Sequence, residues 1–170
     1  MKIGIISDSH DHHANILKAV DIFNEHEVGY ILHAGDIISP FAARAFSEVK
    51  GAKFIAVFGN NDGEKRMLAE TIIKFAGEIC EPPYIGRIEG KRVFMTHSPQ
   101  MLEQAAGGEY DLVVYGHTHK QDIRLAGGTL FVNPGESTDW ITGKSGVLIL
   151  ELDDMSYKEV IIDCRQRWSR

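Results

Sequence analysis

The chain has 170 residues, of which 44% are hydrophobic, so it can form one domain with a buried core. Its formal net charge of −6 and the lack of a basic cluster argue against a protein that binds the backbone of DNA or RNA. Membrane-spanning and secreted classes are excluded too, because the sequence has no long apolar run and no basic leader. The widely separated Cys80 and Cys164 are typical of a reducing compartment, so we expect a cytoplasmic protein.

The chain begins with a predicted strand, a turn and a helix. Residues 3–6 form a continuous apolar run around one glycine, as in a strand that is covered on both faces. Residues 14–26 then change period and place Ile16, Val20 and Phe23 on one helical face. The turn between these two elements carries Asp8 and His10.

The same order of strand, turn and helix recurs twice. The predicted strands are residues 30–33 and 53–58. The first of the two helices starts at Ser39-Pro40, and its buried side is expected to carry Phe41, Ala45, Phe46 and Val49. The second covers residues 64–76, and its buried side is expected to carry Met67, Leu68, Ile72 and Phe75. Three such units predict parallel strands joined by right-handed crossovers. In sheets of this kind, ligands bind beyond the carboxyl ends of the strands.

Beyond Pro82-Pro83 the pattern favours strands. We predict a hairpin of residues 85–88 and 92–96, a short helix over 99–106, strands over 111–115 and 129–132, and a last hairpin of residues 146–152 and 157–162. Residues 165–170 form a polar C-terminal tail. The sequence therefore predicts a single domain over residues 1–164.

Five of the predicted strands end on side chains that can bind a metal ion. In chain order these are Asp8 and His10, then Asp36, Asn60, His97, and His117 with His119. If the strands share a sheet, all seven groups meet at one edge. Two carboxylates, four imidazoles and one amide are too many for one tetrahedral ion and suit two ions of higher coordination that share a carboxylate. Glycines directly before Asp36, Asn60 and His117 would let the backbone turn sharply there.

Two divalent cations in this setting favour a phosphoryl substrate. Beside Asp8 and Asp36 they would leave an excess of positive charge, which attracts an anionic phosphoryl group. We predict hydrolysis in which a hydroxide that bridges the two metals attacks phosphorus in line, while the metals neutralise charge on the equatorial oxygens. No side-chain nucleophile is required.

The ordered motifs resemble the signature of the calcineurin-like metallophosphoesterases. They are Asp8-x-His10, Gly35-Asp36, Gly59-Asn60-x-Asp62, His97 and Gly116-His117-x-His119. The short length and the run Gly59-Asn60-Asn61-Asp62-Gly63 are similar to the small prokaryotic phosphodiesterase branch of that family. The resemblance extends from Ile3 to about Gly135 and implies an α/β (α+β) fold, a four-layer αββα sandwich of two mixed β-sheets flanked by helices. It assigns Asp8, His10, Asp36 and His119 to one metal, and Asp36, Asn60, His97 and His117 to the other.

The sequence departs from the family pattern at two positions. Many relatives carry a histidine at the position of Asn61, where it is thought to protonate the leaving group or to steady the phosphate. An amide can donate a hydrogen bond but no proton, so Asn61 is a candidate substrate-binding residue and favours good leaving groups. Ser98-Pro99 follows His97 where close relatives often carry glycine and then a polar residue, which leaves the contacts at the rim of the site open.

The other histidines and two acidic residues are predicted to be structural. His12, His13 and His26 flank the first predicted helix, and His33 is expected to be packed or hydrogen-bonded behind the ligands. Asp11 and Asp62 are expected to cap helices or to accept hydrogen bonds near the site.

The preferred function is a metal-dependent phosphodiesterase with a small-molecule phosphodiester substrate. An alternative is a non-catalytic protein-binding scaffold on the same fold, similar to the metallophosphoesterase-like subunit of the retromer coat. A nuclease is a third reading, which the acidic charge disfavours. The mixed nitrogen and oxygen ligands admit Mn²⁺, Ni²⁺, Fe²⁺, Co²⁺ or Zn²⁺, and a homo-oligomer is compatible with the sequence.

Overall fold

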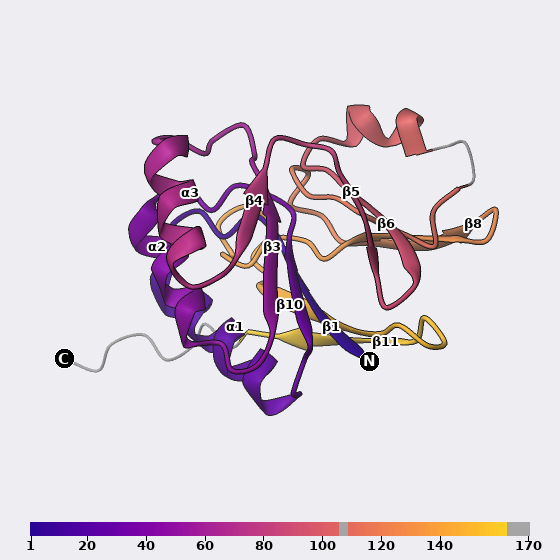
Figure 1. The fold of residues 1–170 in the computed structure, drawn as a ribbon, viewed down its shortest axis with the longest axis horizontal. Coiled ribbons are helices and arrows are strands. Elements are labelled where there is room, and N and C mark those ends of the chain that lie inside the picture. Colours follow the sequence, from indigo (N-terminus) through magenta and orange to yellow (C-terminus); the bar gives the residue numbers. More distant parts are fainter. Residues whose placement is uncertain (106–108, 163–170) are drawn as a thin grey trace.

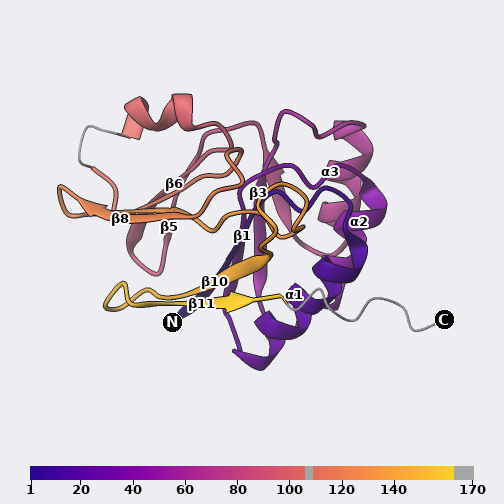
Figure 2. The same cartoon turned by 180° about the vertical axis from the view of Figure 1, so that it is seen from behind.

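Two β-sheets pack face to face in the structure, a computed structural model that describes residues 1–105 and 109–162. The α-helices gather on the outer face of one sheet, the second sheet lies on the other side of it, and a 3-10 helix near residue 100 lies by the second sheet (Figures 1 and 2). This arrangement is the predicted sandwich of two mixed sheets flanked by helices. The predicted tail at residues 165–170 lies outside the described residues, and the single domain over residues 1–164 stays a prediction.

The six-stranded sheet contains the three strands of the repeated units. Its order is β11 (Tyr157–Ile161), β10 (Gly146–Glu151), β1 (Lys2–Ile6), β2 (Tyr30–His33), β3 (Lys53–Val57) and β4 (Glu78–Cys80). Strands β1 to β3 are parallel to one another, as the repeated units predicted. The strand β4, which was not predicted, pairs parallel with β3, and β10 and β11 add an antiparallel edge. The carboxyl ends of β1, β2 and β3 therefore lie side by side.

The five-stranded sheet is formed by the strand-rich second half of the chain. Its order is β5 (Tyr84–Ile88), β6 (Lys91–Met95), β7 (Leu112–Val114), β9 (Thr129–Asn133) and β8 (Asp122–Ala126). Strands β6, β7 and β9 are parallel, and β5 and β8 pair antiparallel at the two edges. The metal-capable side chains thus come from two sheets and not from one shared sheet, so their convergence depends on how the two sheets pack.

The helices follow the strands of the six-stranded sheet. They are α1 (His13–Glu25), α2 (Pro40–Ala45) with a 3-10 turn η1 (Phe46–Glu48), and α3 (Lys65–Lys74), and a 3-10 helix η2 (Pro99–Ala105) follows β6. The N-cap of α2 is Ser39, whose hydroxyl accepts a hydrogen bond from the backbone N–H of Ala42. Among the described residues, no helix is both long and apolar enough to cross a membrane.

Among the described residues, three apolar clusters lie between the layers and pack them together. The first joins the helices to the six-stranded sheet through residues such as Phe23 and Ile6, which are both fully buried. The second fills the space between the sheets, where Ile5 of β1 and Val114 of β7 belong to the same cluster. A smaller third cluster packs Ala105 of η2 on the outer face of the five-stranded sheet. The alternation of side chains along β1 thus serves two different cores.

Two predicted core positions were wrong. Phe41 is 83% exposed, because α2 ends after only six residues and buries three alanines, Ala42, Ala43 and Ala45, in place of Phe41. Met67 is 54% exposed, since it lies in the first turn of α3, whereas Leu68 and Ile72 face the sheet.

Candidate metal centre

All seven predicted ligands lie just beyond the carboxyl ends of five strands. Asp8 and His10 follow β1, Asp36 follows β2, Asn60 follows β3, His97 follows β6, and His117 and His119 follow β7. Hydrogen bonds and short donor distances connect all seven into one cluster. The structure therefore brings every predicted side chain to one place, where the ends of the two sheets meet.

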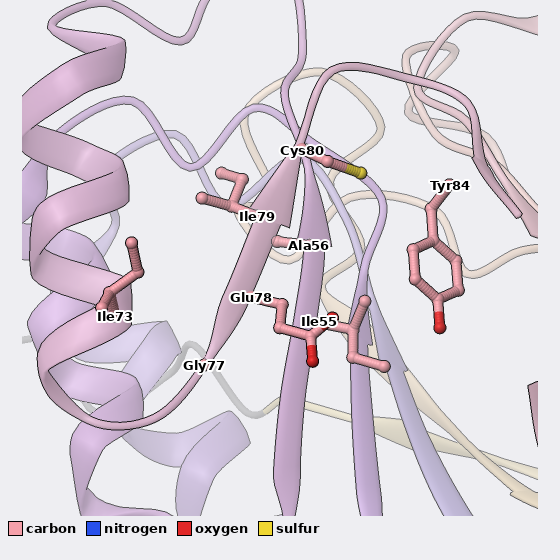
Figure 3. Close-up of a pocket in the computed structure, with 8 residues that line it drawn as sticks. All are labelled: Ile55, Ala56, Ile73, Gly77, Glu78, Ile79, Cys80 and Tyr84. Atoms are coloured by element: carbon pink, nitrogen blue, oxygen red, sulfur yellow. The ribbon is translucent and has the colours of Figure 1, made fainter. Parts of the chain in front are cut away.

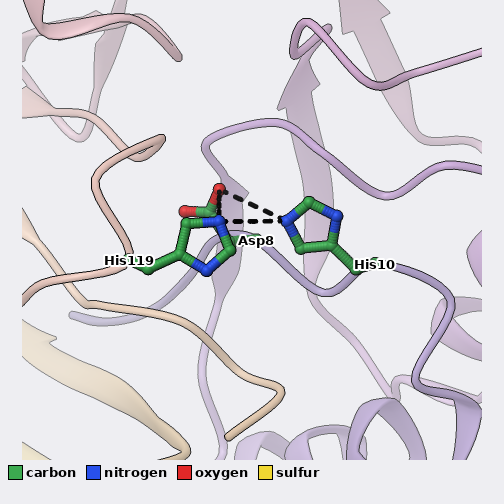
Figure 4. Close-up of side chains that lie close together, drawn as sticks. All are labelled: Asp8, His10 and His119. Atoms are coloured by element: carbon green, nitrogen blue, oxygen red, sulfur yellow. Dashed lines mark hydrogen bonds and ion pairs between the residues drawn. The ribbon is translucent and has the colours of Figure 1, made fainter. Parts of the chain in front are cut away.

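One group of donor atoms is formed by Asp8, His10 and His119 (Figure 4). The Nε2 atoms of His10 and His119 are 3.2 Å apart, and they lie 3.8 and 3.6 Å from Asp8 Oδ1. Asp36 Oδ2 approaches the same group at 3.6 Å from His10 Nε2. These spacings leave room for one ion between the side chains.

The second group shares Asp36 with the first. Nε2 of His97 lies 3.3 Å from Asp36 Oδ2 and 3.0 Å from Asn60 Oδ1, and Nδ1 of His117 lies 2.9 Å from that amide oxygen. Asp36 Oδ2 therefore stands between His10 of one group and His97 of the other. This is the position that a carboxylate bridging two ions requires.

The donor atoms that face the centre suit a cation. Nδ1 of His97 lies 2.8 Å from the carbonyl oxygen of Ala34, which can only accept, so this nitrogen carries the ring proton. Nε2 of His97 then directs a lone pair at the oxygens of Asp36 and Asn60, which are acceptors as well. A proton or a metal ion must lie between such groups, and this mixture of nitrogen and oxygen donors fits a divalent transition metal.

The pKa shifts in the cluster reflect the same crowding. Burial raises the pKa of Asp8. Burial opposes charge on Asp36 as well, but hydrogen bonds with His97 and Asn61 outweigh it and lower the pKa of this carboxyl. Although burial also opposes charge on His97, its contact with Asp36 raises the pKa of the imidazole. The contact with Asp36 thus favours a positive charge at Nε2 of His97.

The backbone around the cluster is strained. Five of the seven residues have a positive φ, namely Asp8 (51°), His10 (39°), Asp36 (59°), His117 (70°) and His119 (60°). Such angles are uncommon for residues other than glycine and persist only where the surrounding structure enforces them. The glycines before Asp36 and His117 support this geometry, because a Cβ atom at Gly35 would lie 2.7 Å from His97 Nδ1 and one at Gly116 would collide with Ser7 Oγ.

Asp62 and His33 hold the loops behind the cluster, as the sequence suggested. Asp62 accepts hydrogen bonds from the backbone N–H groups of Asp36, Ile38 and Gly59, at 3.1, 2.7 and 2.6 Å. His33 accepts from the backbone N–H of Gly35 through Nδ1, so Nε2 donates to the hydroxyl of Ser9. Burial lowers the pKa of His33 to about 3, so this imidazole is neutral. Neither of its ring nitrogens is free to bind a metal.

The remaining structural predictions concern the ends of α1 and α2. His12 is the N-cap of α1 and accepts from the backbone N–H of Asn15, while a ring nitrogen of His26 lies 2.9 Å from the carbonyl oxygen of Ile22. Asp11 accepts hydrogen bonds from the backbone N–H and the hydroxyl of Ser39, and so ties the loop after β1 to the start of α2.

Asn61 lies against Asp36. Its backbone N–H donates to Oδ1 of Asp36 and its side-chain amide donates to Oδ2, both at 2.8 Å. The side chain is exposed, so it borders the open side of the cluster.

Two cavities differ in their relation to the cluster. One of about 390 Å³ is lined by Asn60, His97 and His117, together with Ser98 and Gln100 of the segment after β6. The other, of about 290 Å³, lies along the β3–β4 edge of the six-stranded sheet, with Ile73 of α3 on one side and Tyr84 of β5 on the other, and includes none of the predicted ligands (Figure 3). Only the first of these two cavities opens onto the candidate centre.

Glu136 supports the candidate centre and was not predicted from the sequence. Its fully buried carboxylate lies 3.0 Å from Nδ1 of His119, so it accepts the ring proton and leaves Nε2 free to face Asp8. Burial opposes its charge, but hydrogen bonds from Thr138, His119 and Thr142 outweigh burial and lower the pKa of Glu136 to about 2. The only signal in the sequence was its place after Asn133-Pro134-Gly135, a run that turn formation also explains.

Replacing Glu136 with glutamine should weaken metal binding by about tenfold, because the carboxylate that fixes the tautomer of His119 is lost while the side-chain shape is kept. The dissociation constant for Zn²⁺, measured by isothermal titration calorimetry, checks this expectation. Glu25→Gln, on the exposed side of α1, is the matched control and should bind Zn²⁺ like the native protein. Equal affinity in both variants would contradict a role for Glu136 in holding His119.

The family model that matches this chain is the calcineurin-like phosphoesterase superfamily domain, over residues 1–155. Phosphodiesterase MJ0936 of Methanocaldococcus jannaschii is 38% identical, over 96% of this chain and all of that protein. The solved structure of an archaeal phosphodiesterase, also 38% identical, superimposes with a TM-score of 0.90 over 95% of this chain and 99% of its own. Vps29 of Entamoeba histolytica, with 17% identity and a TM-score of 0.68, covers 96% of this chain and all of its own and shares the fold.

Proposed function

This chain belongs to the calcineurin-like phosphoesterase superfamily, and we propose that it is a metal-dependent phosphodiesterase that hydrolyses small phosphodiesters. The similarity to the phosphodiesterase of Methanocaldococcus jannaschii, which this chain matches along the whole length of that protein, supports this activity. The observation that carries the proposal is the convergence of seven donor side chains around Asp36, which lies between the two groups.

Two divalent ions would be shared among the seven side chains. Asp8, His10, Asp36 and His119 would hold one ion, and Asp36, Asn60, His97 and His117 would hold the other. When bound, such a pair lowers the pKa of a water molecule and neutralises charge on phosphoryl oxygens. Mn²⁺, Ni²⁺, Fe²⁺, Co²⁺ and Zn²⁺ all accept this mixture of nitrogen and oxygen donors.

The protein's own part in the reaction is to position donors. Ala34 and Glu136 accept the Nδ1 protons of His97 and His119, so the Nε2 lone pairs of both rings face the centre. Asp62 ties the loops after β2 and β3 together and thereby fixes Asp36 beside Asn60. This preorganisation avoids the cost of ordering the ligands during the reaction.

Asn61 restricts the leaving group. Its amide donates to Asp36 and cannot supply a proton at neutral pH. Because general acid catalysis typically contributes about 10²- to 10⁴-fold, esters of alcohols that are poor leaving groups should react slowly by comparison. We infer that the enzyme acts best on phosphodiesters whose leaving group is stable as an anion.

The test is hydrolysis of bis-p-nitrophenyl phosphate by protein reconstituted with Mn²⁺ or Ni²⁺. We expect metal-stimulated release of p-nitrophenolate, its loss after chelation, and turnover of dimethyl phosphate at least about a hundredfold slower, since that ester needs an acid. If metal gives no stimulation, the phosphodiesterase proposal fails and the protein-binding scaffold takes its place.

We also propose a cytoplasmic location. The support is the sequence, whose two cysteines, Cys80 and Cys164, are far apart, as is typical of proteins that fold in a reducing compartment. Fractionation of cells that produce the protein would test this, and recovery with a membrane or secreted fraction would contradict it.

A further inference from the structure

Trp140 lies beside the candidate metal centre but is not one of the seven predicted ligands. The centroid of its ring is 6.3 Å from the ring of His10, a predicted ligand, and 5.7 Å from the ring of His12. The residue is nevertheless 62% exposed, so most of the indole faces solvent.

The segment that carries Trp140 is held firmly. Glu136, which orients His119, also accepts hydrogen bonds from the backbone N–H groups of Ile141 and Thr142, at 3.0 and 2.6 Å. The hydroxyl groups of Thr138 and Thr142 donate to the same carboxylate, at 2.5 and 2.7 Å. One buried side chain thus fixes both a predicted metal ligand and the backbone next to Trp140.

Trp140 is therefore preorganised relative to the centre. Glu136 contacts both His119 and the two residues that follow Trp140, so it fixes the backbone at Trp140 relative to His119, and the indole itself lies against the rings of His10 and His12. A surface that is ordered before binding loses little entropy when a ligand packs on it. The large aromatic face can then contribute to affinity for a flat group.

We propose that Trp140 is the stacking surface for a planar aromatic group on the ester substituent that stays on phosphorus, an inference that rests on the proposed function. With its phosphate at the centre, such a substrate directs an ester substituent across His10 onto the indole. An aryl ester and a nucleobase offer the same π face, so both are candidate sources.

A matched pair of substrates tests the inference by kinetics. The p-nitrophenyl ester of thymidine 5′-phosphate and methyl p-nitrophenyl phosphate release the same leaving group and differ only in the other substituent. Trp140→Ala should raise KM for the thymidine ester about tenfold, the loss expected when one base loses an aromatic partner, and leave the methyl ester within about twofold. Trp140→Phe should restore most of the affinity, and Trp140→Leu should not.

Equal losses on both esters would overturn the inference, because they would mean that Trp140 acts on the structure of the centre. Phenyl p-nitrophenyl phosphate in place of the thymidine ester distinguishes the sources. A KM effect of Trp140→Ala on the phenyl ester alone assigns the surface to aryl esters, and an effect on the thymidine ester alone assigns it to nucleobases.

A binding experiment keeps the inference separate from the proposed function. The chain has two tryptophans, so in a Trp168→Phe background the fluorescence comes from Trp140 alone. With Zn²⁺ present, AMP or phenyl phosphate should quench this fluorescence, whereas ribose 5-phosphate and methyl phosphate, which carry the same phosphate without a ring, should not. Quenching without hydrolysis would reject the phosphodiesterase and retain the stacking surface. Hydrolysis without quenching by either ring-bearing phosphate would reject the stacking surface and retain the phosphodiesterase.

Discussion

Replacing Asp36 with asparagine is expected to lower the metal-stimulated rate of phosphodiester hydrolysis by about a thousandfold, which corresponds to ~4 kcal/mol of lost transition-state stabilisation. The reason is that Oδ2 of Asp36 lies 3.6 Å from Nε2 of His10 and 3.3 Å from Nε2 of His97, so one oxygen serves both groups of ligands. Asparagine keeps the shape, but it removes the negative charge and places an amide nitrogen where an oxygen is needed.

The measurement is kcat/KM for bis-p-nitrophenyl phosphate with saturating Mn²⁺, together with the number of metal ions bound per chain. Asp21→Asn, an exposed position on α1, changes the net charge equally and should behave like the native protein. We expect the Asp36 variant to bind fewer ions than this control. A variant that keeps two ions and native turnover would show that Asp36 does not join the two groups.

The strands that carry the site could be predicted because a strand that is buried on both faces is a short, continuous apolar run in the sequence. β2 runs over Tyr30–His33, the predicted range, since a short apolar run ends there at a glycine and an aspartate. α2 begins at Pro40 after the N-cap Ser39, also as predicted, because both residues suit the first turn of a helix. Local signals of this kind need no knowledge of the partner strand.

Other elements depend on partners that the local sequence does not reveal. β4 (Glu78–Cys80) has three residues and owes its conformation to parallel pairing with β3, so no periodicity indicated it. β8 (Asp122–Ala126) is an edge strand that exposes three of its five residues, Arg124, Leu125 and Ala126, and therefore lacks an apolar pattern. Pairing, and not propensity, defines both strands.

The seven ligands could be predicted from the sequence, whereas Glu136, which orients one of them, could not. Each of the seven ligands follows a strand end, so the convergence of the ligands within each sheet could be expected from parallel pairing alone. That β6 and β7 belong to a second sheet is a property of how the sheets pack, which the strand ends do not encode. Glu136 lies 17 positions from His119 in a segment without regular structure, so only the folded chain shows their contact. Residues that act through another residue leave the weakest mark in a sequence.

Replacing Gly59 with alanine is the second large effect that we expect. The new Cβ atom would lie 2.8 Å from Cγ of Asp36 and closer still to its Oδ1 and backbone nitrogen, so Asp36 must move. Displacing a positioned group by about 1 Å can cost ~10²-fold in rate, and forcing atoms into a packed site costs about 1–3 kcal/mol of stability. We therefore expect kcat/KM to fall about a hundredfold, with a lower urea midpoint.

Gly63→Ala separates this collision from the general effect of removing a glycine. Nothing lies within 4 Å of a Cβ atom at Gly63, and the position is four residues along the same loop. Both substitutions reduce the entropy of the unfolded chain equally, so a difference between them reports on the folded state alone. Gly63→Ala should stay within about 0.5 kcal/mol of the native stability and keep full activity. If Gly59→Ala does so too, the close approach of the two loops does not position Asp36.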